Sequence, residues 1–373
     1  MTRHASARGV VVTYSSRDGE GRHAAMTREA VAARLAKVKQ FDFAGPYDPA
    51  KRYAARLYLV PSDTLVGREA AAKLGVRTEN DVFGGVVPTA FAATKTITHP
   101  LVHPKAYAPT GWSHDFAEHV SEAVLHGYTA FSSEDAHRAA ARLLDHGPTR
   151  IKLARGIGGH GQFVIQHAGE LDELLAAIDD AELASVGVVL EEHLDDVTTH
   201  SVGQVRVAGM TASYWGTQRT THNNRGVEVY GGSDLVVVRG GFDALRALPL
   251  STEAQLAISR ALVYDSAADA CFAGFFSSRR NYDVVEGTDA RGRRRAGVLE
   301  QSWRVGGASA AEVEALLAFR DNPAITVLRA ATVETYGASP ALPEGAIVFF
   351  AGDDPRVGPV THYVLVEPHG DVR

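Results

Sequence analysis

Cysteine is nearly absent from this 373-residue chain, and its one thiol, Cys271, excludes an internal disulfide and any cage of cysteine ligands around a metal. Such low cysteine usage is typical of a reducing compartment, so we expect a cytoplasmic protein. No apolar run approaches the length that spans a bilayer, and the N-terminus lacks the apolar core of a signal peptide. We therefore expect no membrane partner.

An excess of basic residues is also lacking, because 38 Lys and Arg stand against 44 Asp and Glu, giving a net charge of −6. Binding to nucleic acid needs a clustered basic field, so no nucleic-acid partner is expected. The densest basic run, residues 291–295, lies among glycines and beside Asp289, which indicates a solvated hairpin tip. The 16 histidines are scattered, without the helix spacing of a zinc site.

The most informative stretch covers residues 149–167, TRIKLARGIGGHGQFVIQH, in which two apolar strands flank a glycine-dense turn. Strand alternation places Lys152 opposite its apolar neighbours. Glycine lets backbone N–H groups approach a ligand closely, so this turn can wrap a phosphate. Its glycines are Gly156, Gly158, Gly159 and Gly161.

Two other phosphate motifs do not fit this stretch. The glycine spacing matches the dinucleotide fingerprint, but that motif needs a helix after the last glycine, and QFVIQH alternates as a strand. A Walker loop is excluded because no Gly-Lys-Ser/Thr closes the run. A plain surface hairpin stays open as an alternative, to be decided by whether the remaining parts of a nucleotide site follow downstream.

The rest of the chain predicts a mixed α/β fold that begins with a small parallel α/β layer. Composition, with 45% hydrophobic and 22% charged residues, is that of a globular protein with two or three structural units. Strands are expected over residues 9–14, 57–60, 187–194, 281–287, 296–307, 346–350 and 362–366, with several more within 201–239, and helices over 23–38, 68–74, 118–125, 134–144, 169–178, 252–264 and 312–319.

Acidic side chains fall on one face of the late hairpin. Asp283 lies opposite the apolar Tyr282 and Val284, and Glu300 shares a face with Ser302. Paired across the hairpin, Asp283 and Glu300 would converge and repel, unless a cation such as phosphate-bound Mg²⁺ sits between them. The alternative is that both are exposed and paired with nearby arginines such as Arg279, Arg280 and Arg304.

With these parts in order, residues 90–310 resemble the ATP-grasp superfamily, and within it a bacterial branch of carboxylate–amine ligases. The motif LEQSWRVGGAS is the most specific, because acid, arginine, both glycines and serine match the family's offsets. The resemblance implies an N-terminal Rossmann-like α/β layer (residues 1–95), then a two-subdomain ATP-grasp fold, with the glycine-rich lid in 96–200 and the metal-ligand strands in 201–373.

The resemblance also implies roles for single residues. The acidic stretch LEEHL, residues 190–194, resembles the family's adenine hinge. Ser302 stands where the family usually has Asn, a change that bears on metal affinity, and the acid that normally follows the hinge and holds the ribose is missing, which bears on nucleotide affinity. The implied residues are Lys95, Lys152, Gly158, Gly159 and Gly161 for phosphates, Glu191, Glu192, Leu194 and Leu299 for the adenine region, Asp283, Glu300 and Ser302 for Mg²⁺, and Arg304 and Arg280 as catalytic arginines.

The implied reaction consumes ATP and Mg²⁺: a small-molecule carboxylate is phosphorylated to an acylphosphate, an amine attacks it, and ADP is released. Two alternatives stay open, a nucleotide-binding regulatory or interaction protein with little turnover, and a small-molecule kinase. The sequence names neither substrate, and it is compatible with a homodimer without fixing the oligomeric state.

Overall fold

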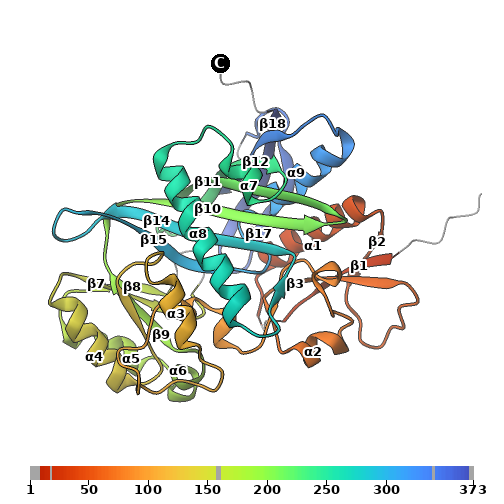
Figure 1. The fold of residues 1–373 in the computed structure, drawn as a ribbon. Helices are drawn as coiled ribbons and strands as arrows, with labels where there is room; N and C mark the ends of the chain where they lie inside the picture. Colours follow the sequence, from red (N-terminus) through yellow and green to blue (C-terminus); the bar gives the residue numbers. More distant parts are fainter. Residues whose placement is uncertain (1–8, 17–18, 157–160, 338–340, 369–373) are drawn as a thin grey trace, which may run out of the picture.

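The computed structural model of the chain describes residues 9–16, 19–156, 161–337 and 341–368, which form four sheets with helices packed against them (Figure 1). None of the helices in these ranges has both the length and the apolar character that a membrane crossing requires. The helices are α1 (Arg22–Lys39), α2 (Arg68–Lys73), α3 (His114–Val120), α4 (Ser133–Leu144), α5 (Ala168–Ala176), α6 (Asp180–Val186), α7 (Phe242–Arg246), α8 (Thr252–Cys271) and α9 (Ser309–Asp321).

The N-terminal part is the expected parallel layer. Strands β2 (Asp42–Pro46), β1 (Gly9–Tyr14) and β3 (Arg56–Pro61) form a parallel sheet in that order, and α1 buries one apolar face, including Val31 and Leu35, in the core. A second small sheet joins β4 (Leu65–Val66) and β5 (Gly85–Val87) to β13 (Phe276–Ser277) from much later in the chain.

The second part contains the glycine-rich hairpin. Its sheet has the order β6 (Gly127–Ala130), β9 (Val188–Glu192), β7 (Thr149–Leu153) and β8 (Gln162–Ile165). Helices α4 and α5 pack on one face, where Ile151 and Leu190 are fully buried. Helix α4 begins after Ser132, whose hydroxyl accepts a hydrogen bond from the Asp135 N–H and caps the helix. The other face of this sheet is left for polar side chains.

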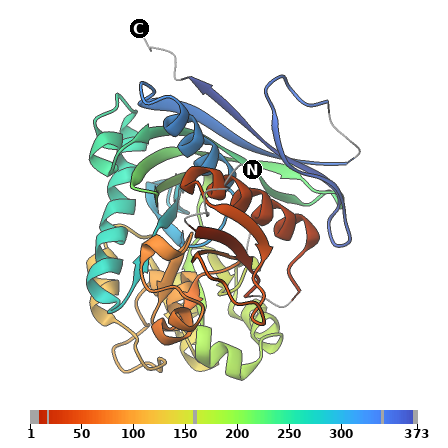
Figure 2. The same ribbon diagram turned by 90° about the vertical axis from the view of Figure 1, so that its right-hand side faces the viewer.

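The third part is an eight-stranded sheet with the order β15-β14-β10-β11-β12-β16-β18-β17. Helix α8 packs on one face, whereas α1 and α9 lie side by side on the opposite face (Figure 2). The strands are β10 (Asp195–Val207), β11 (Met210–His222), β12 (Glu228–Arg239), β14 (Arg279–Thr288), β15 (Arg294–Ser302), β16 (Val327–Tyr336), β17 (Ile347–Asp354) and β18 (Gly358–Pro368).

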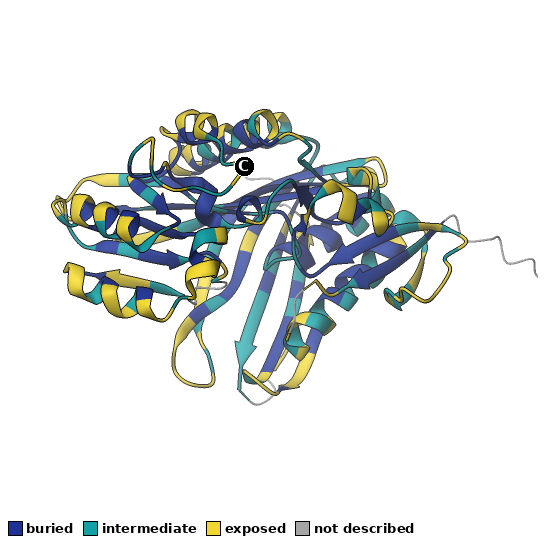
Figure 3. Ribbon diagram, turned by 90° about the horizontal axis from the view of Figure 1, so that it is seen from below, coloured by how far each residue is buried: buried dark blue, intermediate teal, exposed yellow. Residues whose placement is uncertain are grey.

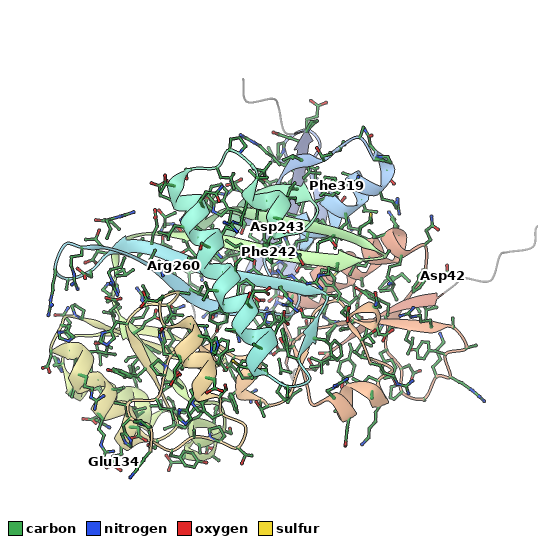
Figure 4. The ribbon with its side chains drawn as sticks, in the orientation of Figure 1. Asp42, Glu134, Phe242, Asp243, Arg260 and Phe319 are labelled. Atoms are coloured by element: carbon green, nitrogen blue, oxygen red, sulfur yellow. The ribbon has the colours of Figure 1, made fainter. Side chains whose placement is uncertain are left out.

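Burial follows these layers. The strands are mostly buried while the outer turns of the helices face solvent (Figure 3). Phe319 of α9 packs into the core beneath that helix (Figure 4). On β14, Tyr282 and Val284 enter the core under α8. Residues of the opposite parity, Asn281 and Asp283, therefore point to the other face of the sheet.

The predicted fold class is confirmed, with differences in particular elements. The helix expected over residues 118–125 is α3, which begins earlier because the Ser113 hydroxyl caps the N–H of Phe116. Helix α8 continues past residue 264 to Cys271 through an alanine-rich stretch with high helix propensity. Strand β16 had no counterpart in the prediction. Strand β10 begins at Asp195, within the range 96–200 that was expected to form the second unit. The expected domain boundaries after residues 95 and 200 stay a proposal.

Candidate active site

A cavity of about 930 Å³ lies where the three parts meet. Its lining comes from the face of the four-stranded sheet that is opposite α4 and α5, from the β14–β15 hairpin, and from the loops that follow β1 and β3. These loops leave the carboxyl ends of parallel strands, where α/β layers commonly bind ligands. Lys152, Glu191, Asp283, Glu300, Ser302 and Arg304 all line it.

Lys152 is held in a buried charge cluster on the cavity wall. Its Nζ lies 2.5 Å from Glu191 Oε1, and the two side chains are 2% and 1% exposed. The other carboxylate oxygen of Glu191 lies 3.0 Å from His99 Nε2. Burial alone would raise the pKa of Glu191, but Lys152 and His99 outweigh it and lower that pKa to about 2. Burial lowers the pKa of Lys152, against the attraction of Glu191.

Lys95 supplies a second buried cation, although its sequence context was less specific. It opens a short 3-10 helix (Lys95–Thr98), and its Nζ lies 2.6 Å from Glu300 Oε2. The same ammonium donates a hydrogen bond of 2.9 Å to the Gly156 carbonyl, at the beginning of the glycine-rich turn. Lys95 thus joins the turn to the acid-bearing strand β15.

Asp283 and Glu300 are cross-strand neighbours in the β14–β15 ladder, as the sequence predicts. Asp283 Oδ1 accepts hydrogen bonds from Gln218, Asn281 and Ser201 at 2.8, 2.9 and 3.3 Å. Burial, and then the nearby Glu300 carboxylate, raise the pKa of Asp283 to about 6. Glu300 pairs with Lys95 and Asp283 with polar side chains, whereas the alternative considered from the sequence paired both acids with arginines. Against burial, which would raise it, Lys95 and to a smaller extent the nearby Arg304 lower the pKa of Glu300.

The donor set of this pair fits a magnesium ion. Mg²⁺ prefers oxygen ligands and uses one or two carboxylates together with substrate phosphates and water. Burial and the Glu300 carboxylate both disfavour the charged form of Asp283, and a divalent ion between the two acids would favour it. Ser302 lies nearby, but its hydroxyl already accepts a hydrogen bond of 3.3 Å from Arg279.

An apolar corner adjoins the charged groups. Leu125, Leu194, Val285 and Leu299 form a small hydrophobic cluster, and all four side chains line the cavity. The register of β14 and β15 shifts between Asp283 and Val284, so that Leu299 is the extra residue of a bulge. The bulge lets consecutive residues Leu299 and Glu300 both reach the cavity, one apolar and one charged.

Glu192 is the last residue of β9 and lies beside this corner. Its carboxylate accepts hydrogen bonds from Arg295 at 3.0 Å and from the His126 N–H at 3.0 Å. The backbone N–H of Glu192 is bonded to the His126 carbonyl, and that of His193 to the Pro148 carbonyl. These bonds fix the connection between the second part and β10, where the hinge was expected.

The two predicted catalytic arginines are separated by the sheet. Arg304 lines the cavity, and its Nε lies 3.7 Å from Asp63 Oδ1. Arg280 instead points to the α8 face, where it pairs with Asp265 and Asp269 at 2.9 and 2.8 Å. Arg280 and Asp283 point to opposite faces of β14, because side chains alternate along a strand. Arg280 therefore belongs to a structural ion-pair network, and its expected catalytic role is corrected.

Arg279 is the arginine of β14 that reaches the cavity, and the prediction missed it. It is 1% exposed, pairs with Glu312 at 2.8 Å, and donates to the Ser302 carbonyl at 3.0 Å. Parity was the available signal, since residues 279, 281 and 283 share one face of β14. The same rule applies to Arg150, which lies two residues before Lys152 and also lines the cavity.

The glycine-rich turn is described only at its two ends. Gly158 and Gly159 lie outside the described residues, so their predicted contact with phosphate stays a prediction. Gly161 has a φ of 71°, which glycine adopts without strain, and its carbonyl accepts a hydrogen bond from the Leu153 N–H. Strands β7 and β8 pair antiparallel around it, so the predicted hairpin is confirmed.

The lysine-bearing hairpin, the acidic strand β9 and the acid-bearing hairpin β14–β15 thus meet at one cavity in the expected order. These are the parts on which the resemblance to the ATP-grasp superfamily rests, and the structure brings them together at one site.

Solved structures similar to the chain include several enzymes. The biotin carboxylase–β,γ-ATP complex from Campylobacter jejuni is 11% identical with a TM-score of 0.49, over 97% of this chain and 88% of that chain. N5-carboxyaminoimidazole synthetase from Staphylococcus aureus, complexed with ADP, is 12% identical with a TM-score of 0.49, and the match covers 96% of this chain and 93% of that chain. Phosphoribosylamine–glycine ligase from Thermotoga maritima is 16% identical with a TM-score of 0.49, and the match covers 95% of this chain and 92% of that chain.

No curated protein matches the chain. The solved structures are too distant in sequence to assign a reaction, so function has to be inferred from the side chains of the cavity. A protein family does match nearly the whole chain, over residues 11–364. The chain belongs to this family, which is described as "Protein of unknown function (DUF3182)".

Proposed function

We propose that this protein is an ATP- and Mg²⁺-dependent ligase that activates a small-molecule carboxylate as an acylphosphate and joins it to an amine, with release of ADP and phosphate. One observation carries the proposal: Asp283 and Glu300 face each other across a ladder in the wall of a cavity that Lys152 also lines, and the buried Lys95 pairs with Glu300 behind it. Facing acids with adjacent cations are what a metal-bound polyphosphate requires.

Phosphate binding is assigned to the lysines. Both ammonium groups are buried, so their charges are screened little by solvent and act strongly on a phosphate that replaces part of their present pairing. Asp283, Glu300 and Ser302 would hold Mg²⁺, which neutralises the charge that develops on the transferring phosphoryl group.

The base of the nucleotide is assigned to the apolar corner of Leu125, Leu194, Val285 and Leu299. A planar, mostly apolar ring gains free energy when it leaves water for such a surface. The corner adjoins Glu300 through the bulge at Leu299, so a nucleotide could place its base on the leucines and its phosphates near the acids.

Arg304 is assigned to the carboxylate substrate. It lines the cavity near Asp63, which follows β3 in the N-terminal layer. A guanidinium group binds carboxylate oxygens through parallel N–H donors and stabilises the negative charge of the acylphosphate. The N-terminal loops would then complete the pocket for the carboxylate and the amine.

The chemistry balances without a redox partner. A carboxylate oxygen attacks the γ-phosphorus of ATP and ADP leaves, and then the amine nitrogen attacks the acyl carbon. Phosphate leaves with the bonding electrons of the C–O bond, and the new amide nitrogen gives up a proton. Acylphosphates hydrolyse readily, so the cavity has to exclude water until the amine arrives.

Ser302 favours a second candidate, a nucleotide-binding regulatory or interaction protein with little turnover. A hydroxyl is a weaker metal ligand than the family's usual amide oxygen, and here Arg279 already donates to it. A small-molecule kinase is a third reading of the same residues and would leave a stable phosphate ester. We also propose a cytoplasmic location, from the cysteine usage, and a homodimer as the assembly to test first.

Hydroxylamine provides the test, because it traps acylphosphates as hydroxamates. The full-length protein is incubated with ATP, Mg²⁺, hydroxylamine and a panel of carboxylic acids, and ADP, AMP and hydroxamate are followed. The proposal predicts equal amounts of ADP and hydroxamate with at least one acid. Release of AMP, or a stable phosphate ester, would contradict it.

A further inference from the structure

Three potential metal ligands cluster in a region of the cavity that the proposed reaction does not use. They are His23 in the first turn of α1, Glu334 on β16 and His362 on β18. Each offers one ligand atom, and these atoms all lie within 4.8 Å of one another. All three residues line the cavity.

The backbone explains why the three side chains converge. Glu334 and His362 are direct cross-strand neighbours in the antiparallel β16–β18 pair, so their side chains share one face of the sheet. Helix α1 covers this part of the large sheet and brings His23 over it, with ring centroids of His23 and His362 5.9 Å apart. Two separate parts of the fold therefore build the cluster.

One imidazole nitrogen of each histidine in this cluster is unsatisfied. His23 Nε2 and His362 Nε2 are buried and have no hydrogen-bond partner within the described part of the chain. His362 is only 3% exposed, so water does not readily replace a missing partner. Buried polar atoms are normally paired, and two bare nitrogens beside one carboxylate are an exception that a bound ion would remove.

Neighbouring groups orient the ligands as they do in metal sites. The Thr27 hydroxyl lies 3.5 Å from His362 Nδ1, which leaves Nε2 free to bind an ion. Asp354 Oδ2 accepts a hydrogen bond of 2.7 Å from the His23 backbone N–H, which fixes the first turn of α1.

From this geometry we infer that His23, Glu334 and His362 form a binding site for a divalent transition-metal ion, with zinc as the best match, and that an open coordination position faces the cavity. Two histidines and one carboxylate are a recurrent zinc ligand set, with water or substrate in the fourth position. Ligands of one tetrahedral zinc ion are about 3.3 Å apart, so small side-chain rotations would close the site.

This site differs in kind from the acidic pair at Asp283 and Glu300. Imidazole nitrogens suit zinc, cobalt or iron, whereas all-oxygen donors suit magnesium. The two sites should therefore load independently, and the open position of the nitrogen-rich site could take a coordinating group of a substrate. Sequence spacing could not reveal the site, because its histidines come from opposite ends of the chain.

Metal titration of the full-length protein tests the inference. Protein stripped with a chelator is titrated with Zn²⁺ in competition with a chromophoric chelator, and with Co²⁺, whose visible absorption reports nitrogen ligation. We expect one equivalent to bind, with excess Mg²⁺ unable to displace it. His23→Asn, Glu334→Gln and His362→Gln should each weaken binding by on the order of 100-fold or more.

A second histidine pair provides the matched control. The rings of His126 and His146 are 6.0 Å apart, so His146→Asn measures adventitious binding and should leave the affinity unchanged. If buried His362→Gln fails to fold by circular dichroism, His23→Asn on the first turn of α1 retains the test. Absence of stoichiometric binding, unchanged binding in the three variants, or loss in His146→Asn would overturn the inference. MgATP titration of the same variants separates this outcome from failure of the proposed function.

Discussion

Lys152 Nζ lies 2.5 Å from Glu191 Oε1 in a buried ion pair, and this pairing is both a structural and a functional constraint. A buried pair contributes little net stability, but removal of one partner leaves an uncompensated charge in a low-dielectric environment. The lysine that is proposed to bind phosphate is therefore also needed to neutralise the acid behind it.

The first prediction separates these two roles. Lys152→Met should lower the free energy of unfolding by about 3–5 kcal/mol, because it leaves the buried Glu191 carboxylate with only His99 beside it. Lys152→Met combined with Glu191→Gln should recover most of the stability but not the affinity for ATP. Denaturant unfolding and ATP titration measure the two quantities. Lys105→Ala is the control, because Lys105 is exposed and lies outside the cavity. Recovery of ATP affinity in the double variant would show that Lys152 does not bind phosphate.

A second prediction concerns pH and the acidic pair. The pKa of Asp283 is raised to about 6, above its value in the unfolded chain, so its carboxylate costs stability as pH rises through that value. Without metal, Asp283→Asn should therefore be more stable than the wild type by about 1–3 kcal/mol at pH 7.5. The advantage should shrink as pH falls from 6 towards 4. Urea unfolding in EDTA at several pH values checks this, and a pH-independent difference would contradict it.

A third prediction concerns Ser302, which stands where ATP-grasp proteins usually have Asn. Ser302→Asn replaces a hydroxyl by an amide oxygen, a better ligand for a hard cation, and should tighten Mg²⁺ binding in the presence of ATP. Ser302→Ala should weaken it. Calorimetric titration of Mg²⁺ into protein saturated with ATP gives both values. Equal affinities in the two variants would show that residue 302 is not a ligand.

The fourth prediction assigns Arg304 to the reaction step. Arg304→Ala should leave the dissociation constant of MgATP nearly unchanged but lower hydroxamate formation by on the order of 100-fold or more, since it removes a charge that stabilises the acylphosphate. Arg280→Ala is expected to behave differently, with loss of stability, because Arg280 pairs with Asp265 and Asp269 beneath α8. If Arg304→Ala instead weakens MgATP binding, Arg304 binds the nucleotide rather than the acylphosphate.

Strand alternation was sufficient to predict part of the site. It placed Lys152 on the polar face of its hairpin and brought Asp283 and Glu300 together, because both relationships depend only on period-two geometry and one turn. The same rule, applied to β14, would have chosen Arg279 rather than Arg280.

Other features depend on tertiary packing and could not be read along the chain. The Lys95–Glu300 pair joins a short 3-10 helix to a strand of another sheet. The bulge at Leu299 comes from a shift in the register of β14 and β15, and the local sequence pattern does not predict such a shift. His23 and His362 meet because α1 packs against β17, the neighbour of β18 at the edge of the large sheet. Such contacts join segments that are remote in sequence, so their spacing carries no periodic signal.

The measurement that tests the central claim most directly is the stabilisation of the full-length protein by ATP, with Mg²⁺ and with EDTA, in the wild type, Glu300→Gln and the exposed control Glu173→Gln. A ligand at a hundredfold excess over its Kd adds about 2.7 kcal/mol to the stability of the folded state. We predict that ATP and Mg²⁺ stabilise the wild type and Glu173→Gln jointly, and that Glu300→Gln loses most of the metal-dependent part. Equal stabilisation by ATP in Mg²⁺ and in EDTA, or none in either, would contradict the account.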